Sequence, residues 1–125
     1  MIELDVNAKK IAETLLNDLI KVNQFDNSIK YFRKDLVRMV IWLYIMSEFS
    51  KKQKINIEDI SREIAQVITI SKPSLRLILE NAKDKGFLKF THNQEDTRSW
   101  MIEPESITIE EFNAWTKKIG SLITE

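Results

Sequence analysis

One short segment, residues 71–85, gathers side chains that can bind phosphate groups and the edges of bases. Hydroxyl and lysine side chains stand at its start, where a helix offers free N–H groups and a partial positive charge to a phosphate. An arginine follows, whose guanidinium can bond guanine O6 and N7, and an asparagine further along is a weaker base or backbone ligand. The candidate contact residues of this segment are Ser71, Lys72, Ser74, Arg76, Leu77 and Asn81.

Two residues on the same outward face are less suited to binding DNA. Leu77 is apolar, and it can either meet a thymine methyl group or mark a surface that does not read bases. Glu80 carries a negative charge, which repels phosphate. The residues alone therefore leave two interpretations open, a surface that binds duplex DNA and a surface that binds protein.

Catalytic and metal-binding chemistry has little support in the sequence. The chain has one histidine, His92, and no cysteine, so it has no thiolate nucleophile, no disulfide framework and no cysteine metal site. It also has no glycine-rich phosphate loop and no zinc or calcium motif. We therefore expect no catalytic residue, no metal ligand and no cofactor, and we predict that the protein is not an enzyme.

The candidate side chains need a helix to position them. Within residues 71–85 the apolar residues recur at helical spacing, Ser71 is a favoured N-cap, and Gly86 is the residue that a helix prefers just past its end. A shorter helix is predicted before it over residues 57–66, with Asn56 as its N-cap. Two short helices with a tight connection are typical of a helix-turn-helix.

The pattern changes to strands after Gly86. Residues 87–91 and 99–103 are rich in β-forming side chains, and a polar loop joins them, which predicts a hairpin. Helix, helix and hairpin in this order predict a winged helix-turn-helix, whose second helix we name the reading helix.

At these residues the chain resembles the MarR family of winged-helix transcriptional regulators. The matching stretches are residues 64–75 in the helix-turn-helix, residues 85–88 at the entry to the wing, and residues 96–102 in the wing. The Asp-x-Arg pattern of the last stretch is the feature that distinguishes this family from other winged-helix families. The resemblance implies that Arg98 enters the minor groove while Asp96 orients it, and that two subunits interlock through their N- and C-terminal helices.

A local excess of positive charge over residues 51–98 favours a DNA-binding surface. The whole chain has no net charge, but residues 51–98 hold ten basic and seven acidic side chains. A surface that faces phosphates needs such a local excess of positive charge. The excess is small, and ordinary scatter of charges would also produce it.

Apolar stripes at helical spacing mark both ends of the chain. Residues 5–22 and a helix after Pro104 carry one stripe each, and residues 28–49 predict a long central helix with an apolar middle. Thr108 and Glu111 have the spacing of a capping box for the last helix. The winged unit and one central helix cannot obviously cover both terminal stripes, so we expect a homodimer.

Together these patterns predict a mainly α fold with a small β-hairpin wing, in one domain over residues 1–125. N-terminal and central helices occupy residues 1–50, the winged helix-turn-helix residues 51–103, and a C-terminal dimerisation helix residues 104–125. The chain has no signal peptide and no apolar run long enough to span a bilayer, so we expect a cytoplasmic protein with no membrane contact.

With the resemblance, the predicted function is a sequence-specific DNA-binding transcriptional regulator that acts as a homodimer. The reading helix enters the major groove and the wing the minor groove of double-stranded DNA, and a small-molecule effector held between the central helix and the reading unit is a further expected partner. The alternative is a winged-helix module that binds protein and has little affinity for DNA.

Overall fold

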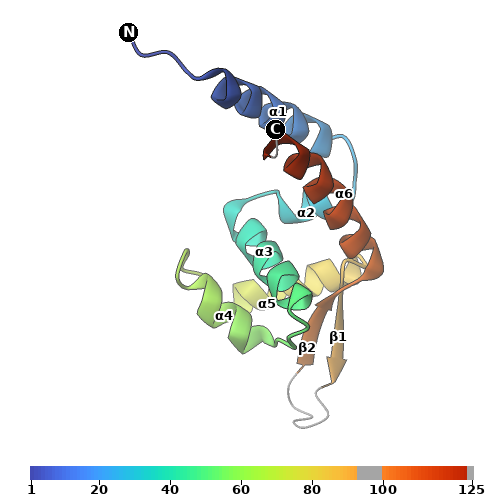
Figure 1. The fold of residues 1–125 in the computed structure, drawn as a ribbon. Helices are drawn as coiled ribbons and strands as arrows, with labels where there is room; N and C mark the ends of the chain where they lie inside the picture. Colours follow the sequence, from blue (N-terminus) through green and yellow to red (C-terminus); the bar gives the residue numbers. More distant parts are fainter. Residues whose placement is uncertain (93–99, 124–125) are drawn as a thin grey trace.

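The structure is a computed structural model, and it describes residues 1–92 and 100–123. Over these residues the fold is mainly helical with one antiparallel hairpin, which confirms the predicted fold class. Figure 1 shows α1 and α6 side by side at one end of the molecule, and α3, α4, α5 and the hairpin at the other. The elements are α1 (Val6–Val22), α2 (Ser28–Phe32), α3 (Leu36–Ser50), α4 (Ile57–Ile64), α5 (Lys72–Asp84), β1 (Leu88–His92), β2 (Trp100–Pro104) and α6 (Ser106–Ile123).

The two helices of the helix-turn-helix begin at the caps that the sequence predicts. The Asn56 side chain accepts from the backbone N–H of Asp59 at 2.9 Å, and the Asp59 carboxylate accepts from the backbone N–H of Asn56 at 3.0 Å, which makes the capping box of α4. Ser71 caps α5 by accepting from the backbone N–H of Ser74 at 3.2 Å. Gly86 follows α5 with φ of 82°, a left-handed conformation that glycine adopts without strain.

The hairpin is attached directly to the start of the helix-turn-helix. β1 and β2 are antiparallel, with Leu88 opposite Pro104 and His92 opposite Trp100. The backbone N–H of Ile102 also donates to the carbonyl oxygen of Ile55 at 2.8 Å, one residue before the N-cap of α4. The wing therefore has a defined position relative to α4 and α5.

One hydrophobic core connects the winged unit to α2 and α3. Trp42 of α3 lies at its centre with 1% of its surface exposed, stacked on Phe32 and in edge-on contact with Phe112 of α6. Edge-on and stacked aromatic contacts of this kind add to the free energy of burying the rings. The buried members of the core are Ile29, Phe32, Ile41, Trp42, Ile45, Met46, Ile55, Ile60, Ile64, Leu75, Leu79, Ala82, Leu88 and Ile102.

The predicted single helix over residues 28–49 is wrong, because the structure has two helices there. α2 ends at Phe32 and α3 begins at Leu36. Asp35 separates them, with an extended backbone and a carboxylate that accepts from the backbone N–H of Arg38 at 2.9 Å. An aspartate side chain competes for backbone N–H groups in this way, so it favours a helix start over a helix interior.

The predicted capping box at Thr108 and Glu111 is also wrong. α6 begins earlier, at Ser106, and Thr108 is a buried residue whose hydroxyl donates to the carbonyl oxygen of Phe87 at 2.7 Å. The Glu111 carboxylate accepts from the backbone N–H of Ser28 at 3.0 Å, at the start of α2. Both side chains thus make long-range contacts that attach α6 to the rest of the fold.

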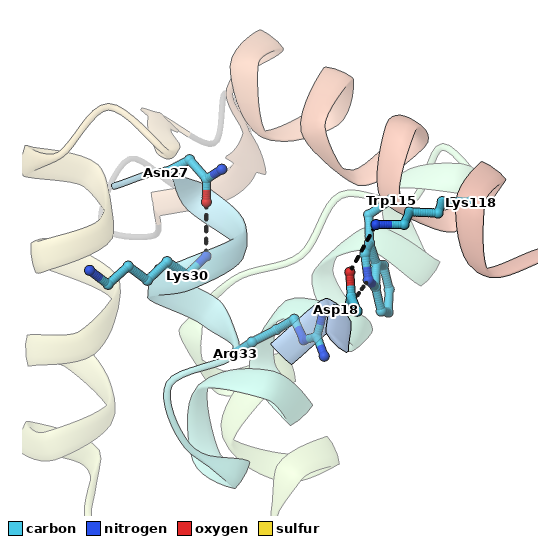
Figure 2. Close-up of polar contacts among 6 residues, drawn as sticks. All are labelled: Asp18, Asn27, Lys30, Arg33, Trp115 and Lys118. Carbon is cyan, nitrogen blue, oxygen red and sulfur yellow. Dashed lines mark hydrogen bonds and ion pairs between the residues drawn. The ribbon is translucent and has the colours of Figure 1, made fainter. Parts of the chain in front are cut away.

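A buried carboxylate joins α1 to α6. Asp18 is 5% exposed, and its Oδ2 accepts from the indole N–H of Trp115 at 2.9 Å and from the guanidinium of Arg33, which follows α2. The Lys118 ammonium lies 3.8 Å from Oδ1 (Figure 2). The guanidinium of Arg33 also lies over the Trp115 ring, 4.9 Å from its centroid. This cluster therefore holds three separate segments of the chain together.

The surroundings of Asp18 favour its charged form. Burial raises the pKa of the carboxyl, but hydrogen bonds from Arg33 and Trp115 and the charges of Arg33 and Lys118 outweigh it and lower the pKa below 3.8. When the folded-state pKa is lowered, the group stabilises the fold at pH values above its unfolded pKa. That stability is lost as the pH falls through the folded pKa.

We predict that Asp18→Asn lowers the free energy of unfolding by about 3 kcal/mol at neutral pH, because it leaves the Arg33 guanidinium buried without its counter-charge. Urea denaturation at one fixed protein concentration measures the change. The matched control is Asp26→Asn, an exposed carboxylate close by, which should change stability by less than about 0.5 kcal/mol. The difference between wild type and Asp18→Asn should shrink as the pH falls below 3.8; a constant difference there contradicts the assignment.

Candidate functional site

The outward face of α5 presents the predicted contact residues to solvent. Leu75, Leu79 and Ala82 point into the core, which turns the opposite side of the helix outward. Leu77 is 58% exposed, so its apolar side chain lies open at the centre of this face. Arg98 and Asp96 lie outside the described residues. The exposed candidates are Ser71, Lys72, Ser74, Arg76, Leu77 and Asn81.

One side of α5 faces a hollow next to the wing, which we name the wing hollow. It has a volume of about 740 Å³ and lies between the start of α4, α5 and the hairpin. Arg76, Glu80 and Lys83 of α5 line it, at spacings that place them along one side of the helix. Phe90 and Trp100 of the hairpin contribute aromatic walls. A charged helix face and an aromatic strand face therefore meet in this hollow.

Acidic side chains offset the positive charge around the wing hollow. The Lys72 ammonium lies 2.6 Å from the Glu58 carboxylate at the start of α4. The Lys83 ammonium lies over the Phe90 ring, 5.2 Å from its centroid, and Lys89 pairs with Glu103 across the hairpin at 3.5 Å. The surface is a mixture of both signs of charge, not a uniformly basic patch.

Asn81 lies on a different side of α5 from Arg76. With Lys85 it lines a second hollow of about 680 Å³, between the end of α1, α2 and the end of α5. Five basic side chains line this hollow with one acid, Asp26, so we name it the basic hollow. Its basic residues are Lys30, Arg33, Lys34, Arg38 and Lys85.

Two arginines of the basic hollow have unused hydrogen-bond donors. The Nε atoms of Arg33 and Arg38 are buried and have no partner among the described residues. Buried N–H groups without partners are uncommon in folded proteins and call for an acceptor. Each arginine is already paired with a carboxylate, Arg33 with Asp18 and Arg38 with Asp35. The positive charge that the hollow offers to a small anion therefore comes from Lys30, Lys34 and Lys85.

Tyr31 connects the basic hollow to the reading helix. It lines the hollow, and its hydroxyl donates to the backbone carbonyl oxygen of Ile78 in α5 at 2.7 Å. Burial raises the pKa of the Tyr31 phenol, and the nearby charge of Asp35 raises it further while Arg38 lowers it. The phenol therefore remains a hydrogen-bond donor at neutral pH.

α1 carries a row of exposed apolar side chains. We name these residues the α1 stripe, and they lie at the end of the molecule away from the wing (Figure 1). Leu16 is 58% exposed and Ile20 52%. An apolar surface of this extent usually meets a partner. The α1 stripe consists of Ile11, Leu15, Leu16, Leu19 and Ile20.

Sequence reasoning missed Glu58, Tyr31 and Trp100. Glu58 and Tyr31 reach α5 only because of how α4 and α2 pack against it, and no local pattern shows that. Trp100 lies directly opposite His92 in the hairpin, with ring centroids 3.8 Å apart. The strand pattern could have predicted this contact, because opposite residues of a hairpin are neighbours. The prediction would have required the exact register of the two strands.

Other kinds of site find no support in the part of the chain that the structure describes. Within it, no three side chains of the types His, Cys, Asp and Glu come together as a metal site. Among its helices, none combines the length and the apolar character needed to cross a membrane.

Solved structures of MarR-family regulators share this fold. A G34K mutant of MepR from S. aureus is 16% identical over 97% of this chain and 80% of its own, with a TM-score of 0.61. A MarR-like transcriptional regulator from Thermotoga maritima is 12% identical over 97% and 79%, with a TM-score of 0.57. BpsR from Bordetella bronchiseptica, whose DNA binding is regulated by 6-hydroxynicotinic acid, is 9% identical over 98% and 81%, with a TM-score of 0.52.

No family model and no curated protein matches the sequence. The likeness to the solved structures is therefore one of fold, and the chain has the winged-helix fold of MarR-type regulators.

Proposed function

We propose that the protein is a DNA-binding transcriptional regulator of the MarR type, not an enzyme, and that it works as a homodimer. The observation that carries the proposal is the exposed start of α5. Ser71 caps the helix there, and Lys72 and Arg76 are solvent-exposed beside a wing whose position is defined. In a winged helix-turn-helix the second of the two helices is the element that enters a major groove.

Each side chain of this surface has a role that follows from its chemistry. The N–H groups at the start of α5, with Ser71, Lys72 and Ser74, bind backbone phosphates and fix the position of the helix. Arg76 donates to guanine O6 and N7, and Leu77 packs against thymine methyl groups. Asn81, which lies on the side of the basic hollow, makes a backbone contact at most. The resemblance to the MarR-family wing assigns Arg98 to the minor groove.

The α1 stripe supports the homodimer. α1 lies at the end of the molecule away from the wing and the start of α5, so a second subunit can cover the α1 stripe without blocking α5 (Figure 1). A two-fold axis through this contact places two reading helices on a palindromic site, about one turn of DNA apart.

A small anionic molecule is the effector that the basic hollow suits best. Lys34 and Lys85 line it and have no ion-pair partner among the described residues, whereas Arg33 and Arg38 are paired with Asp18 and Asp35. Tyr31 lines the hollow, and its hydroxyl donates to the Ile78 carbonyl oxygen of α5. A bound anion would therefore contact a residue that is hydrogen-bonded to the reading helix. Regulation of BpsR by an aromatic acid is consistent with this class of ligand.

The competing proposal is a module that binds protein. Leu77 in the middle of the exposed face and the balance of charge in the wing hollow favour it. Duplex binding and its salt dependence separate the two proposals, because a protein partner needs no phosphate contacts.

We predict that the wild-type protein binds a mixed-sequence duplex of about three helical turns, and that affinity falls steeply between about 50 and 200 mM salt. Arg76→Ala should weaken binding about tenfold, because it removes a contact of the reading helix. Lys117→Ala, an exposed lysine of α6, is the control and should change affinity less than twofold. Fluorescence anisotropy measures these affinities. A folded wild-type protein that does not bind at about 50 mM salt favours the protein-binding module.

We predict that Leu16→Glu converts the protein from dimer to monomer, because it places a charge in the α1 stripe. Leu16 is 58% exposed, so the substitution costs the single subunit little. Leu43→Glu is the control, since Leu43 is an exposed leucine of α3 outside the stripe and its replacement should leave the dimer intact. Sedimentation equilibrium at micromolar concentration reports the mass. A monomeric wild type, or dissociation by both variants, contradicts the interface.

We predict that an aromatic carboxylate, 6-hydroxynicotinate, binds the basic hollow and raises the unfolding temperature. The double variant Lys34→Gln/Lys85→Gln should bind it about tenfold more weakly, because two favourable charges are removed. The matched control Lys89→Gln/Lys117→Gln also removes two lysines and should bind it as the wild type does. Titration calorimetry measures the affinities, and equal affinity in both double variants is incompatible with this site.

A further inference from the structure

We infer that Glu58 sets the strength of DNA binding, by holding Lys72 in an ion pair that a DNA phosphate has to displace. The inference rests on the proposed function and adds a regulating contact to the same surface. It makes Glu58 of α4 a residue that limits the affinity for DNA.

The geometry of the contact carries the inference. The Lys72 Nζ lies 2.6 Å from the Glu58 Oε1, and the two side chains are 52% and 58% exposed. Lys72 is the first residue of α5, and Glu58 is the second residue of α4. The pair therefore bridges the starts of the two helices at the surface, next to the wing hollow that Glu58 lines.

Glu58 is not needed to cap its own helix. Asn56 and Asp59 make the complete capping box of α4, and Asp59 also pairs with Arg62 at 2.8 Å. A carboxylate in the first turn adds only a modest interaction with the helix dipole. The direct contact of Glu58 is instead with a basic side chain of the neighbouring reading helix.

The Glu58 carboxylate occupies the position that a phosphate oxygen would take beside Lys72. A carboxylate and a phosphate both accept the same charge-assisted hydrogen bond from an ammonium group. When DNA binds, one anion therefore replaces another, and the gain from the new contact is reduced. The displaced carboxylate also stays beside the phosphates, which repel it.

Other cations of the reading helix are not held in this way. Among the described residues no ion pair within 4.0 Å involves Arg76, and Lys83 lies over the Phe90 ring, a contact that leaves its charge in place. Lys72 also stands at the helix start, where the free N–H groups make a phosphate most favourable. Neutralising this one lysine therefore lowers affinity more than neutralising a cation further along α5.

The test is a double-mutant cycle on duplex affinity with wild type, Glu58→Gln, Lys72→Gln and the double variant. Glutamine keeps the size of each side chain and removes its charge. We expect Glu58→Gln to tighten binding about fivefold at low salt and to steepen the salt dependence by up to about one counterion. In the Lys72→Gln background the same change should tighten binding less than twofold, since the lysine it releases is absent.

Glu63→Gln is the matched control, because Glu63 is an exposed glutamate of the same helix with no ion pair among the described residues. It should change affinity less than twofold in either background. A gain from Glu58→Gln that is equal with and without Lys72, or equal to that from Glu63→Gln, overturns the inference, because it reports only the net charge of the protein.

The outcomes also separate this inference from the proposed function. If wild type binds duplex and Glu58→Gln binds no tighter, the inference fails and the proposed function stands. If neither protein binds at about 50 mM salt, both fail. Unfolding temperatures of the four proteins, measured in parallel, should agree closely, because the exposed pair contributes little to folding stability.

Discussion

The buried carboxylate of Asp18 is the interaction on which the arrangement of the molecule depends. It accepts hydrogen bonds from Arg33 after α2 and from Trp115 of α6, and these partners come from distant parts of the chain. A charge with so little exposure is tolerated only when donors surround it. The cluster thereby fixes the direction in which α1 leaves the core, and with it the position of the α1 stripe.

The winged unit depends much less on that cluster. Its helices begin at local caps, its hairpin is attached to Ile55 through the backbone, and its apolar residues fill a shared core. The fold therefore joins a winged unit that is determined by local contacts to a pair of terminal helices that is held by long-range polar contacts. Thr108 of α6 connects the two parts directly, through its hydrogen bond to Phe87. α2 connects them indirectly, because Tyr31 donates to Ile78 of α5 and the backbone N–H of Ser28 donates to Glu111 of α6.

The division between local and long-range contacts explains what the sequence could predict. Asn56, Ser71 and Gly86 act on residues next to them, so the bounds of α4 and α5 and the hairpin that follows were predictable. Asp35 interrupts an apolar run that otherwise has a helical pattern. Thr108 and Glu111 have the spacing of a capping box, but their side chains bond to Phe87 and Ser28 instead. The exposure of the candidate face of α5 followed from its periodicity. The pairing of Lys72 with Glu58 did not, because it depends on the packing of two helices.

The hydrogen bond from Tyr31 to Ile78 has a consequence for how such a protein can evolve. The acceptor is a main-chain carbonyl, which every residue type supplies at that position. Exposed side chains of α5 can therefore be exchanged without losing the attachment of the helix to α2. A lineage with this arrangement can therefore vary the surface of α5 while it keeps the same attachment to α2.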